Sequence, residues 1–173
     1  MEEQVILVND SDHPVGTMGK LEAHRNPVLH RAFSVFIFNS SGDMLLQQRA
    51  INKYHSAGLW TNACCSHPRP GEDTVVAATR RLQEELGFST TLEKTFDFIY
   101  QATVGNGLHE YEFDHVYMGE YDKEIMPDPG EVSDFCFMDM SAIQSSLHGN
   151  PELYTAWFAI AFPKMARWKQ MRR

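Results

Sequence analysis

The chain has 173 residues, of which 43% are hydrophobic and 22% charged, and this composition is typical of an ordinary globular protein. The net charge of −8 argues against a general nucleic-acid-binding surface, because such surfaces neutralise phosphates with lysine and arginine. No apolar stretch approaches the roughly 18 to 20 residues that a membrane span needs, and the first residues lack a signal-peptide pattern. We therefore expect one domain over residues 1–173, in the cytoplasm, with no membrane partner.

The cysteines are Cys64, Cys65 and Cys136, a set too small and odd in number for a disulfide framework. Such a set fits a reducing compartment. At least one free thiol is therefore expected to be available for chemistry.

Strand patterns dominate the chain outside two segments. After a short apolar VILV stretch, the first clear strand is Ala32–Asn39, which is rich in aromatic and β-branched residues and ends at the turn Ser40–Asp43. Met44–Arg49 is predicted to be its hairpin partner. Further strands, each bounded by Gly, Pro, Asn or Asp, are predicted at Trp60–Cys65, Phe96–Ala102, Glu110–Glu120 and Phe135–Met138.

The two exceptions carry helical patterns. Between Asp73 and Leu86 apolar residues recur at helical spacing, and Gly87 follows where a left-handed C-terminal residue belongs. A second helical region runs from about Pro151 to Lys169, and Pro163 inside it should kink or split the helix. Strands, one central helix, more strands and a terminal helix predict an α+β fold, or an α/β sandwich.

Charged residues lie on and just before the central helix at fixed spacing. This spacing resembles the Nudix box, whose register fits Glu72, Arg80, Leu82, Glu84, Glu85, Gly87 and Phe88. Ser66 stands where the box has its first glycine, and Arg81 stands where it has a glutamate. In Nudix hydrolases the glutamates hold the magnesium that activates water on a diphosphate, so the resemblance suggests a diphosphate that is held and not cut. Taken alone, the pattern also fits a solvated helix with an ordinary charge pair.

The segment WTNACCSHP places Cys65 and His67 two residues apart, so that both would point the same way from a strand. Taken alone, they fit a buried structural cysteine or a fragment of a metal site. The segment resembles the cysteine signature of type I isopentenyl-diphosphate isomerases, with Cys65, not Cys64, at the position of the catalytic cysteine. The resemblance extends from VILV to the helix of Trp157 and implies a Nudix-like fold, with mixed β-sheets flanked by helices.

Two carboxylates, Glu110 and Glu112, share one face of a predicted strand, where repulsion is relieved by solvent, a proton or a metal. The resemblance favours a metal, because in this family the pair joins three histidines around one divalent ion. The matching positions are His24, His30 and His67, and Mg²⁺, Mn²⁺ or Zn²⁺ is expected there. The histidines that match no ligand position, and that we expect to be structural or exposed, are His13, His55, His109, His115 and His148.

The resemblance also assigns the diphosphate pocket. Lys20, Arg49, Lys53 and Arg81 would supply positive charge and forked hydrogen bonds. Glu85 would bind a second ion, Mg²⁺, that bridges the diphosphate oxygens. The implied substrate is a small isoprenoid diphosphate, and we expect a monomer or weak dimer with no nucleic-acid partner.

Isomerisation protonates a double bond that no neighbouring carbonyl assists, so it needs a strong, positioned acid in a dry site. By resemblance, Glu112 is the proton donor, tuned by Tyr100, and the Cys65 thiolate is the acceptor on the other side. Nearby positive charge would favour that thiolate. Trp157 would lie over the developing cation. For Tyr100 and Trp157, plain core packing is the alternative.

Two other functions compete with this interpretation. A Nudix hydrolase of nucleoside diphosphate derivatives is favoured by the acids of the helix but opposed by Ser66 and Arg81, and it needs neither Cys65 nor the pair of glutamates on the strand. A non-catalytic metal- or nucleotide-binding module would bind metal tightly without turnover. That alternative leaves the combination of Cys65, Glu112 and Trp157 unexplained.

Overall fold

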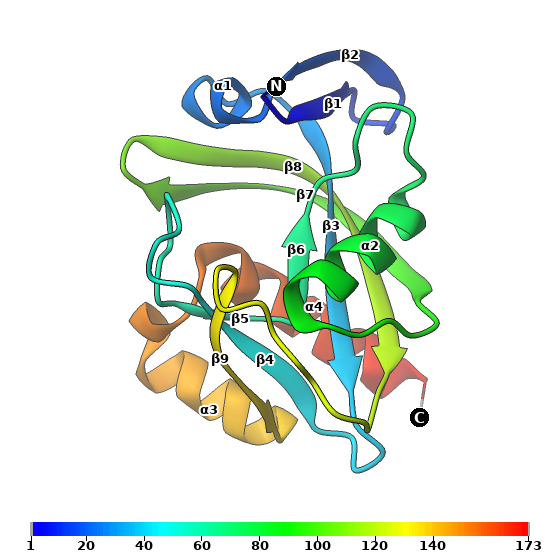
Figure 1. The fold of residues 1–173 in the computed structure, drawn as a ribbon, viewed down its shortest axis with the longest axis vertical. Coiled ribbons are helices and arrows are strands. Elements are labelled where there is room, and N and C mark those ends of the chain that lie inside the picture. The colour runs from blue at the N-terminus through cyan, green and yellow to red at the C-terminus, as the bar shows by residue number, and fades with distance from the viewer. Residues whose placement is uncertain (1, 173) are drawn as a thin grey trace.

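The strands of the molecule pair into one mixed sheet, seen in the computed structural model, which describes residues 2–172 (Figure 1). They are β1 (Gln4–Val8), β2 (Pro14–Gly19), β3 (His30–Phe38), β4 (Met44–Arg49), β5 (Trp60–Thr61), β6 (Cys64–Ser66), β7 (Glu93–Gly105), β8 (Leu108–Glu120) and β9 (Val132–Met138). The main path runs β2-β1-β3-β4-β5. Strands β6 and β8 also pair with β3, while β7 pairs with β8 and β9 pairs with β4.

Strand β3 is the axis of the sheet. It pairs in parallel with β8, and this register sets His30 beside Glu112 at one end. It pairs antiparallel with β6, where Ser34 faces Cys65. The register therefore brings three separate sequence motifs to the same part of the sheet.

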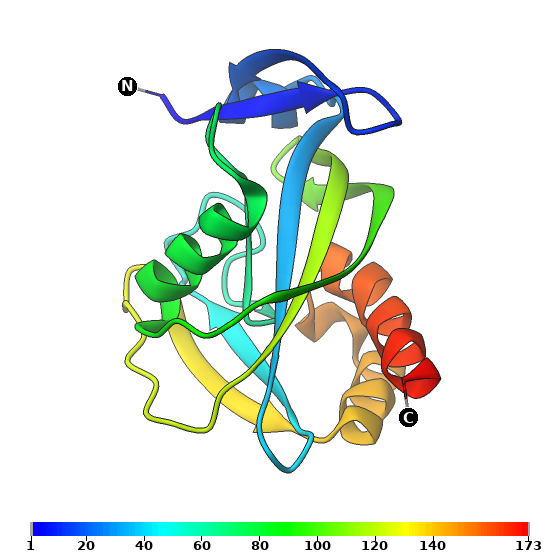
Figure 2. The same ribbon diagram turned by 90° about the vertical axis from the view of Figure 1, so that its right-hand side faces the viewer.

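Helices cover both faces of the sheet. They are α1 (Lys20–Arg25), α2 (Thr74–Leu86), α3 (Met140–Gly149), the 3₁₀ turn Pro151–Leu153 and α4 (Ala156–Met171). Figure 2 shows α2 on one side of β3 and β8, and α3 and α4 on the other. Because side chains alternate along β3, Val35 and Ile37 pack under α2, whereas Phe36 and Phe38 pack against α4.

The α+β architecture and the central helix are confirmed. Asp73 caps α2, since its side chain accepts a hydrogen bond from the Val75 N–H at 3.0 Å, and Gly87 ends the helix with φ 75°. The β7–β8 hairpin turns at Asn106 and Gly107, both with positive φ, which is the backbone that a tight two-residue hairpin requires.

Several boundaries differ from the sequence prediction. The segment Trp60–Cys65 is two short strands and not one. The terminal helix is not split at Pro163, which lies inside α4, and the break comes earlier, between the 3₁₀ turn and Thr155. Helices α1 and α3 and strand β2 were not predicted. Among residues 2–172, no helix combines the length and apolar character needed to cross a membrane.

Candidate active site

Three buried histidines converge where α1, the start of β3 and the end of β6 meet. The imidazoles of His24 and His30 each donate from Nδ1, to the carbonyl oxygens of Lys20 and Val28, both at 2.7 Å. These bonds leave the Nε2 lone pairs free for a ligand role. His30 Nε2 lies 3.2 Å from His67 Nε2. The two ring nitrogens are therefore close enough to bind one ion together.

The glutamate pair of β8 completes this cluster. Glu112 Oε1 lies 2.9 Å from His67 Nε2 and 3.5 Å from His30 Nε2. The ligand atoms of His24, His30, His67 and Glu112 all lie within 4.8 Å of one another, and all four side chains are buried. The donor set therefore fits a divalent metal ion.

Glu110 lies on the neighbouring side of the cluster. Its ligand atom groups with those of His24 and His55, again within 4.8 Å, and not with the set that contains Glu112. The Tyr100 hydroxyl lies between the two carboxylates, 2.7 Å from Glu110 Oε2 and 2.6 Å from Glu112 Oε2. Tyr100 thus connects the two halves of the cluster.

The two carboxylates differ in their electrostatics. Burial and the charge of Glu112 raise the pKa of Glu110 well above its usual value. Burial alone would also raise the pKa of Glu112, but hydrogen bonds from His30 and His67 outweigh it and hold that pKa well below its usual value. The pKa values of the two neighbouring carboxyl groups are therefore shifted in opposite directions.

Cys64 and Cys65 project to opposite faces of β6. Cys64 is fully buried in the core under α2, whereas Cys65 lines the pocket. The Cys65 thiol donates to Asn62 Oδ1 at 3.1 Å and lies 3.4 Å from Ser34 Oγ, which donates to the Asp114 carboxylate at 2.7 Å. Burial and the Asp114 charge raise the pKa of Cys65, so the thiol form is favoured here, contrary to the expected effect of nearby positive charge.

Asn62 links Cys65 to the helix of Trp157. The Thr155 hydroxyl caps α4 by accepting from the Phe158 N–H and donates to Thr61 Oγ1 at 3.1 Å. Thr61 in turn donates to Asn62 Oδ1 at 2.9 Å, the atom that also accepts from Cys65. A continuous buried chain of hydrogen bonds therefore fixes the thiol relative to α4.

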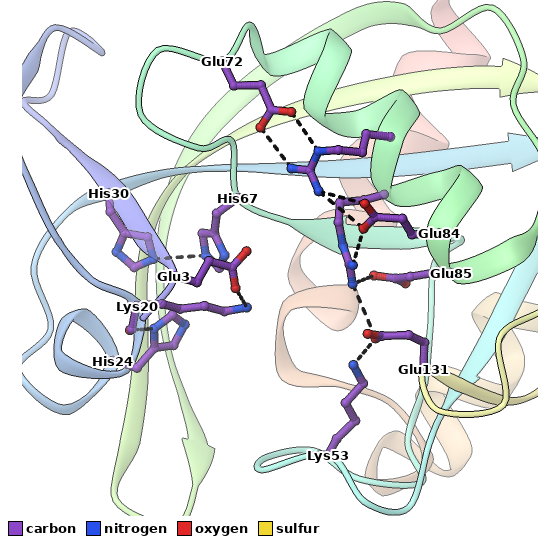
Figure 3. A network of polar contacts seen from close by, with 12 residues as sticks. Glu3, Lys20, His24, His30, Lys53, His67, Glu72, Glu84, Glu85 and Glu131 are labelled. Carbon is purple, nitrogen blue, oxygen red and sulfur yellow. Dashed lines mark hydrogen bonds and ion pairs between the residues drawn. The ribbon is translucent and has the colours of Figure 1, made fainter. Parts of the chain in front are cut away.

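The four predicted basic residues also reach this pocket, and the two lysines among them meet acids from distant segments (Figure 3). Lys20 lies 3.0 Å from Glu3, and Lys53 is paired with Glu131. Arg81, on α2, lies 2.7 Å from Glu85 and 3.4 Å from Glu131. The side chains that line the pocket are Lys20, His24, Arg49, Lys53, Tyr54, His55, Cys65, Ser66, His67, Arg81, Glu85, Tyr100, Glu110, Glu112 and Trp157.

Some donors in the pocket have no protein acceptor. Arg49 Nε, Arg81 Nε and Trp157 Nε1 are buried and make no hydrogen bond within residues 2–172. The guanidinium carbon of Arg49 lies 5.2 Å from the centre of the Trp157 ring, a cation–π distance. Unsatisfied buried donors beside cationic groups are suited to an anionic ligand.

Comparisons with known proteins identify the family of the chain. The NUDIX domain family matches residues 28–158. The chain is 44% identical over 176 residues to "Isopentenyl-diphosphate Delta-isomerase 2" of Photorhabdus laumondii, covering 99% of each chain. It is 47% identical over 176 residues to "Isopentenyl-diphosphate Delta-isomerase" of Serratia proteamaculans, covering 99% of this chain and 98% of that one. The chain belongs to the isopentenyl-diphosphate Delta-isomerases of the Nudix family.

Solved structures share the fold of this isomerase-family chain at low sequence identity. A Deinococcus radiodurans protein matches with a TM-score of 0.76 and 18% identity, covering 94% of this chain and 98% of that chain. The MutT protein of Methanosarcina mazei matches with a TM-score of 0.67 and 18% identity, covering 84% and 96%. These likenesses confirm the Nudix-like fold.

The Nudix helix of this family member has its acids occupied by arginines. Arg80 lies 2.8 Å from Glu72 and 3.3 Å from Glu84, and Arg81 lies 2.6 Å from Glu84. Glu85 is held by Arg81 and by Gln47, whose amide donates at 2.8 Å. Every predicted acid of the helix therefore has an arginine partner, and among them Glu85 faces the pocket.

Sequence reasoning missed several residues of the site. His55 was expected to be structural or exposed, but it is 5% exposed and lines the pocket. Burial, followed by the positive charge of Arg49, lowers its pKa to about 3. Glu3, Glu131 and Asp114 were also unassigned, because only the fold brings them to the cations or to Cys65. The one sequence signal for Asp114 was its spacing: it follows Glu112 by two residues, as Glu112 follows Glu110.

Proposed function

We propose that this chain isomerises isopentenyl diphosphate to dimethylallyl diphosphate by adding a proton at one carbon and removing one at another. The observation that carries the proposal is that Cys65 and Glu112 line one pocket together with four basic side chains. Relatives named for this activity align over nearly the whole chain. A hydrolase needs neither the thiol nor the glutamate pair of β8.

In the proposed reaction Glu112 donates a proton to the double bond, and Cys65 as thiolate removes one from the adjacent methylene carbon. Because the structure lowers the pKa of Glu112 and raises that of Cys65, this assignment requires substrate and metal binding to reverse both shifts. The hydroxyl of Tyr100, 2.6 Å from Glu112, tunes how readily that carboxyl gives up its proton. The indole of Trp157 lies over the developing positive charge and offers it no nucleophile. The geometry of the hydrogen-bonded Cys65 thiol supports its role as the second partner.

The residues proposed to hold a divalent ion are His24, His30, His67, Glu110 and Glu112. Mg²⁺, Mn²⁺ and Zn²⁺ all accept such donors. When bound, the ion supplies fixed positive charge beside the reacting carboxyl. Two observations support this assignment: backbone carbonyl groups orient the buried imidazoles of His24 and His30, and the ligand atoms of these histidines lie close to those of His67 and Glu112.

The diphosphate is proposed to bind Lys20, Arg49, Lys53 and Arg81, and Glu85 would hold a Mg²⁺ ion that supplies further positive charge to the diphosphate. Binding would replace the acid partners Glu3 and Glu131, since one carboxylate offers less charge than a diphosphate. The buried Arg49 and Arg81 donors that lack acceptors support the same placement.

The proposal extends to the molecule as a whole. We infer a single domain over residues 1–173 that acts as a monomer or weak dimer in the cytoplasm. The net charge of −8 supports the absence of a nucleic-acid partner.

The test is to incubate the purified protein with isopentenyl diphosphate and Mg²⁺, following products by phosphorus and proton NMR. We expect dimethylallyl diphosphate to accumulate with both phosphorus signals of the diphosphate intact. Release of inorganic phosphate or pyrophosphate would instead assign the site to hydrolysis.

A further inference from the structure

His55 occupies a position between the metal cluster and the apolar end of the pocket. It lies in the loop formed by residues 50–59, which connects β4 to β5. Its ring lies 6.1 Å from that of His24, nearly parallel to it, and 5.8 Å from that of Trp157, edge to face. Only 5% of the residue is exposed, so its imidazole belongs to the site and not to the surface.

The imidazole of His55 has a nitrogen within reach of two proposed metal ligands. The ligand atoms of His24, His55 and Glu110 all lie within 4.8 Å of one another. Two ligand atoms on opposite sides of one ion are about 4.0 to 4.4 Å apart, since each bond is about 2.0 to 2.2 Å. The spacing of this group is therefore close to what one ion needs. Ser56 Oγ donates its proton to the Val104 carbonyl at 3.5 Å, so in its contact with His55 Nδ1, 3.2 Å away, it accepts a hydrogen bond from the Nδ1–H. This tautomer leaves the Nε2 lone pair for a metal ion.

We propose that His55 is an additional ligand of the divalent ion, on the side of Glu110. This inference rests on the metal site of the proposed function. The ligand atom of His55 groups with those of His24 and Glu110, and this group shares His24 with the set formed by His24, His30, His67 and Glu112.

Coordination by His55 would connect the metal to the diphosphate side of the pocket. Arg49 Nη2 donates to the His55 carbonyl at 3.2 Å, and Lys53 lies in the same loop. The loop is anchored to the β7–β8 hairpin, because Asn106 Nδ2 donates to the Tyr54 carbonyl at 3.0 Å. Metal binding therefore holds in place the loop that carries a diphosphate-binding lysine.

The experiment is a Co²⁺ titration of metal-free full-length protein, followed by visible absorption and by competition with a chelator. The variants are His55→Ala and the larger His55→Gln, and the matched control is His13→Ala, because His13 is an exposed histidine. Circular dichroism checks that each metal-free variant is folded. His24→Ala is the reference for loss of a central ligand.

We expect His55→Ala and His55→Gln to bind Co²⁺ at least about tenfold more weakly, with a changed ligand-field spectrum, while His13→Ala matches the wild type. Wild-type affinity and spectrum in both His55 variants, alongside weakened binding by His24→Ala, would overturn the role of His55 alone. Unchanged binding by His24→Ala would instead contradict the metal site of the proposed function.

Discussion

Two adjacent cysteines project from opposite faces of β6, and only one of them lines the pocket. Cys64 packs in the core under α2, while Cys65 contacts Asn62 and Ser34 at the pocket. We expect Cys65→Ala to lower the isomerisation rate by at least about a thousandfold, since a general base contributes about 10²–10⁴-fold. Cys64→Ala should keep near-wild-type turnover and lose some stability through its cavity.

Rates of the two variants under saturating substrate, with thermal unfolding as a check on folding, measure this difference. A loss of activity in Cys64→Ala as large as that in Cys65→Ala would contradict the assignment of Cys65 as the catalytic cysteine.

At the residue scale, the sequence predicted those groups that motifs mark. The glutamate pair of β8, the segment WTNACCSHP and the three histidines converge because the β3–β8 and β3–β6 registers align them. His55 could not be predicted in the same way. No periodic pattern identifies it, and its place depends on how the loop formed by residues 50–59 folds over the pocket.

At the scale of elements, α2 ends at a glycine that packs directly against another chain segment. Gly87 has φ 75°, and a Cβ there would meet the carbonyl oxygen of Met126, with the carbonyl carbon 3.1 Å away. Gly71 has φ 79° but no atom within 4 Å of the same position, so it is a matched control for backbone strain alone.

We expect Gly71→Ala to lower the free energy of unfolding by about 1 kcal/mol, from the left-handed backbone. Gly87→Ala should lower it by roughly 2 to 4 kcal/mol, because the backbone clash adds to that strain. Urea denaturation of both variants measures the difference, and equal losses would show that the contact with Met126 is relieved without cost.

Elements with strong periodicity were predictable, and short ones were not. The α2 pattern gave both ends of that helix because Asp73 and Gly87 mark them chemically. Strand β2 and helix α1 are short and have few buried side chains; β2 is held by pairing with β1, and α1 packs against β8. Pro163 was expected to interrupt the last helix, but the surrounding apolar side chains pack α4 into the core and keep it continuous.

At the scale of the whole molecule, buried ionisable groups gather in one place, and their opposing pKa shifts influence acid stability. Burial lowers the pKa of His55 to about 3, so the folded metal-free protein binds fewer protons there than the unfolded chain. The stabilising effect of a neutral His55 is present above pH 6.5 and is lost as the pH falls toward about 3.

A comparison with His55→Gln isolates this effect from the raised pKa of Glu110, which acts in the opposite direction. Between pH 6 and 4, the unfolding free energy of the wild type minus that of the variant should fall by about 1.4 kcal/mol per pH unit. Urea denaturation of both metal-free proteins across this range measures it. A difference independent of pH would mean that His55 titrates normally.

The most direct test of the account is conversion of isopentenyl diphosphate in deuterated water with Mg²⁺, with the position of deuterium followed by NMR. We predict deuterium in the newly formed methyl group of dimethylallyl diphosphate, an intact diphosphate, and no detectable conversion by folded Glu112→Gln or Cys65→Ala. A product without solvent deuterium, or wild-type conversion by either variant, would contradict protonation and deprotonation by this pair.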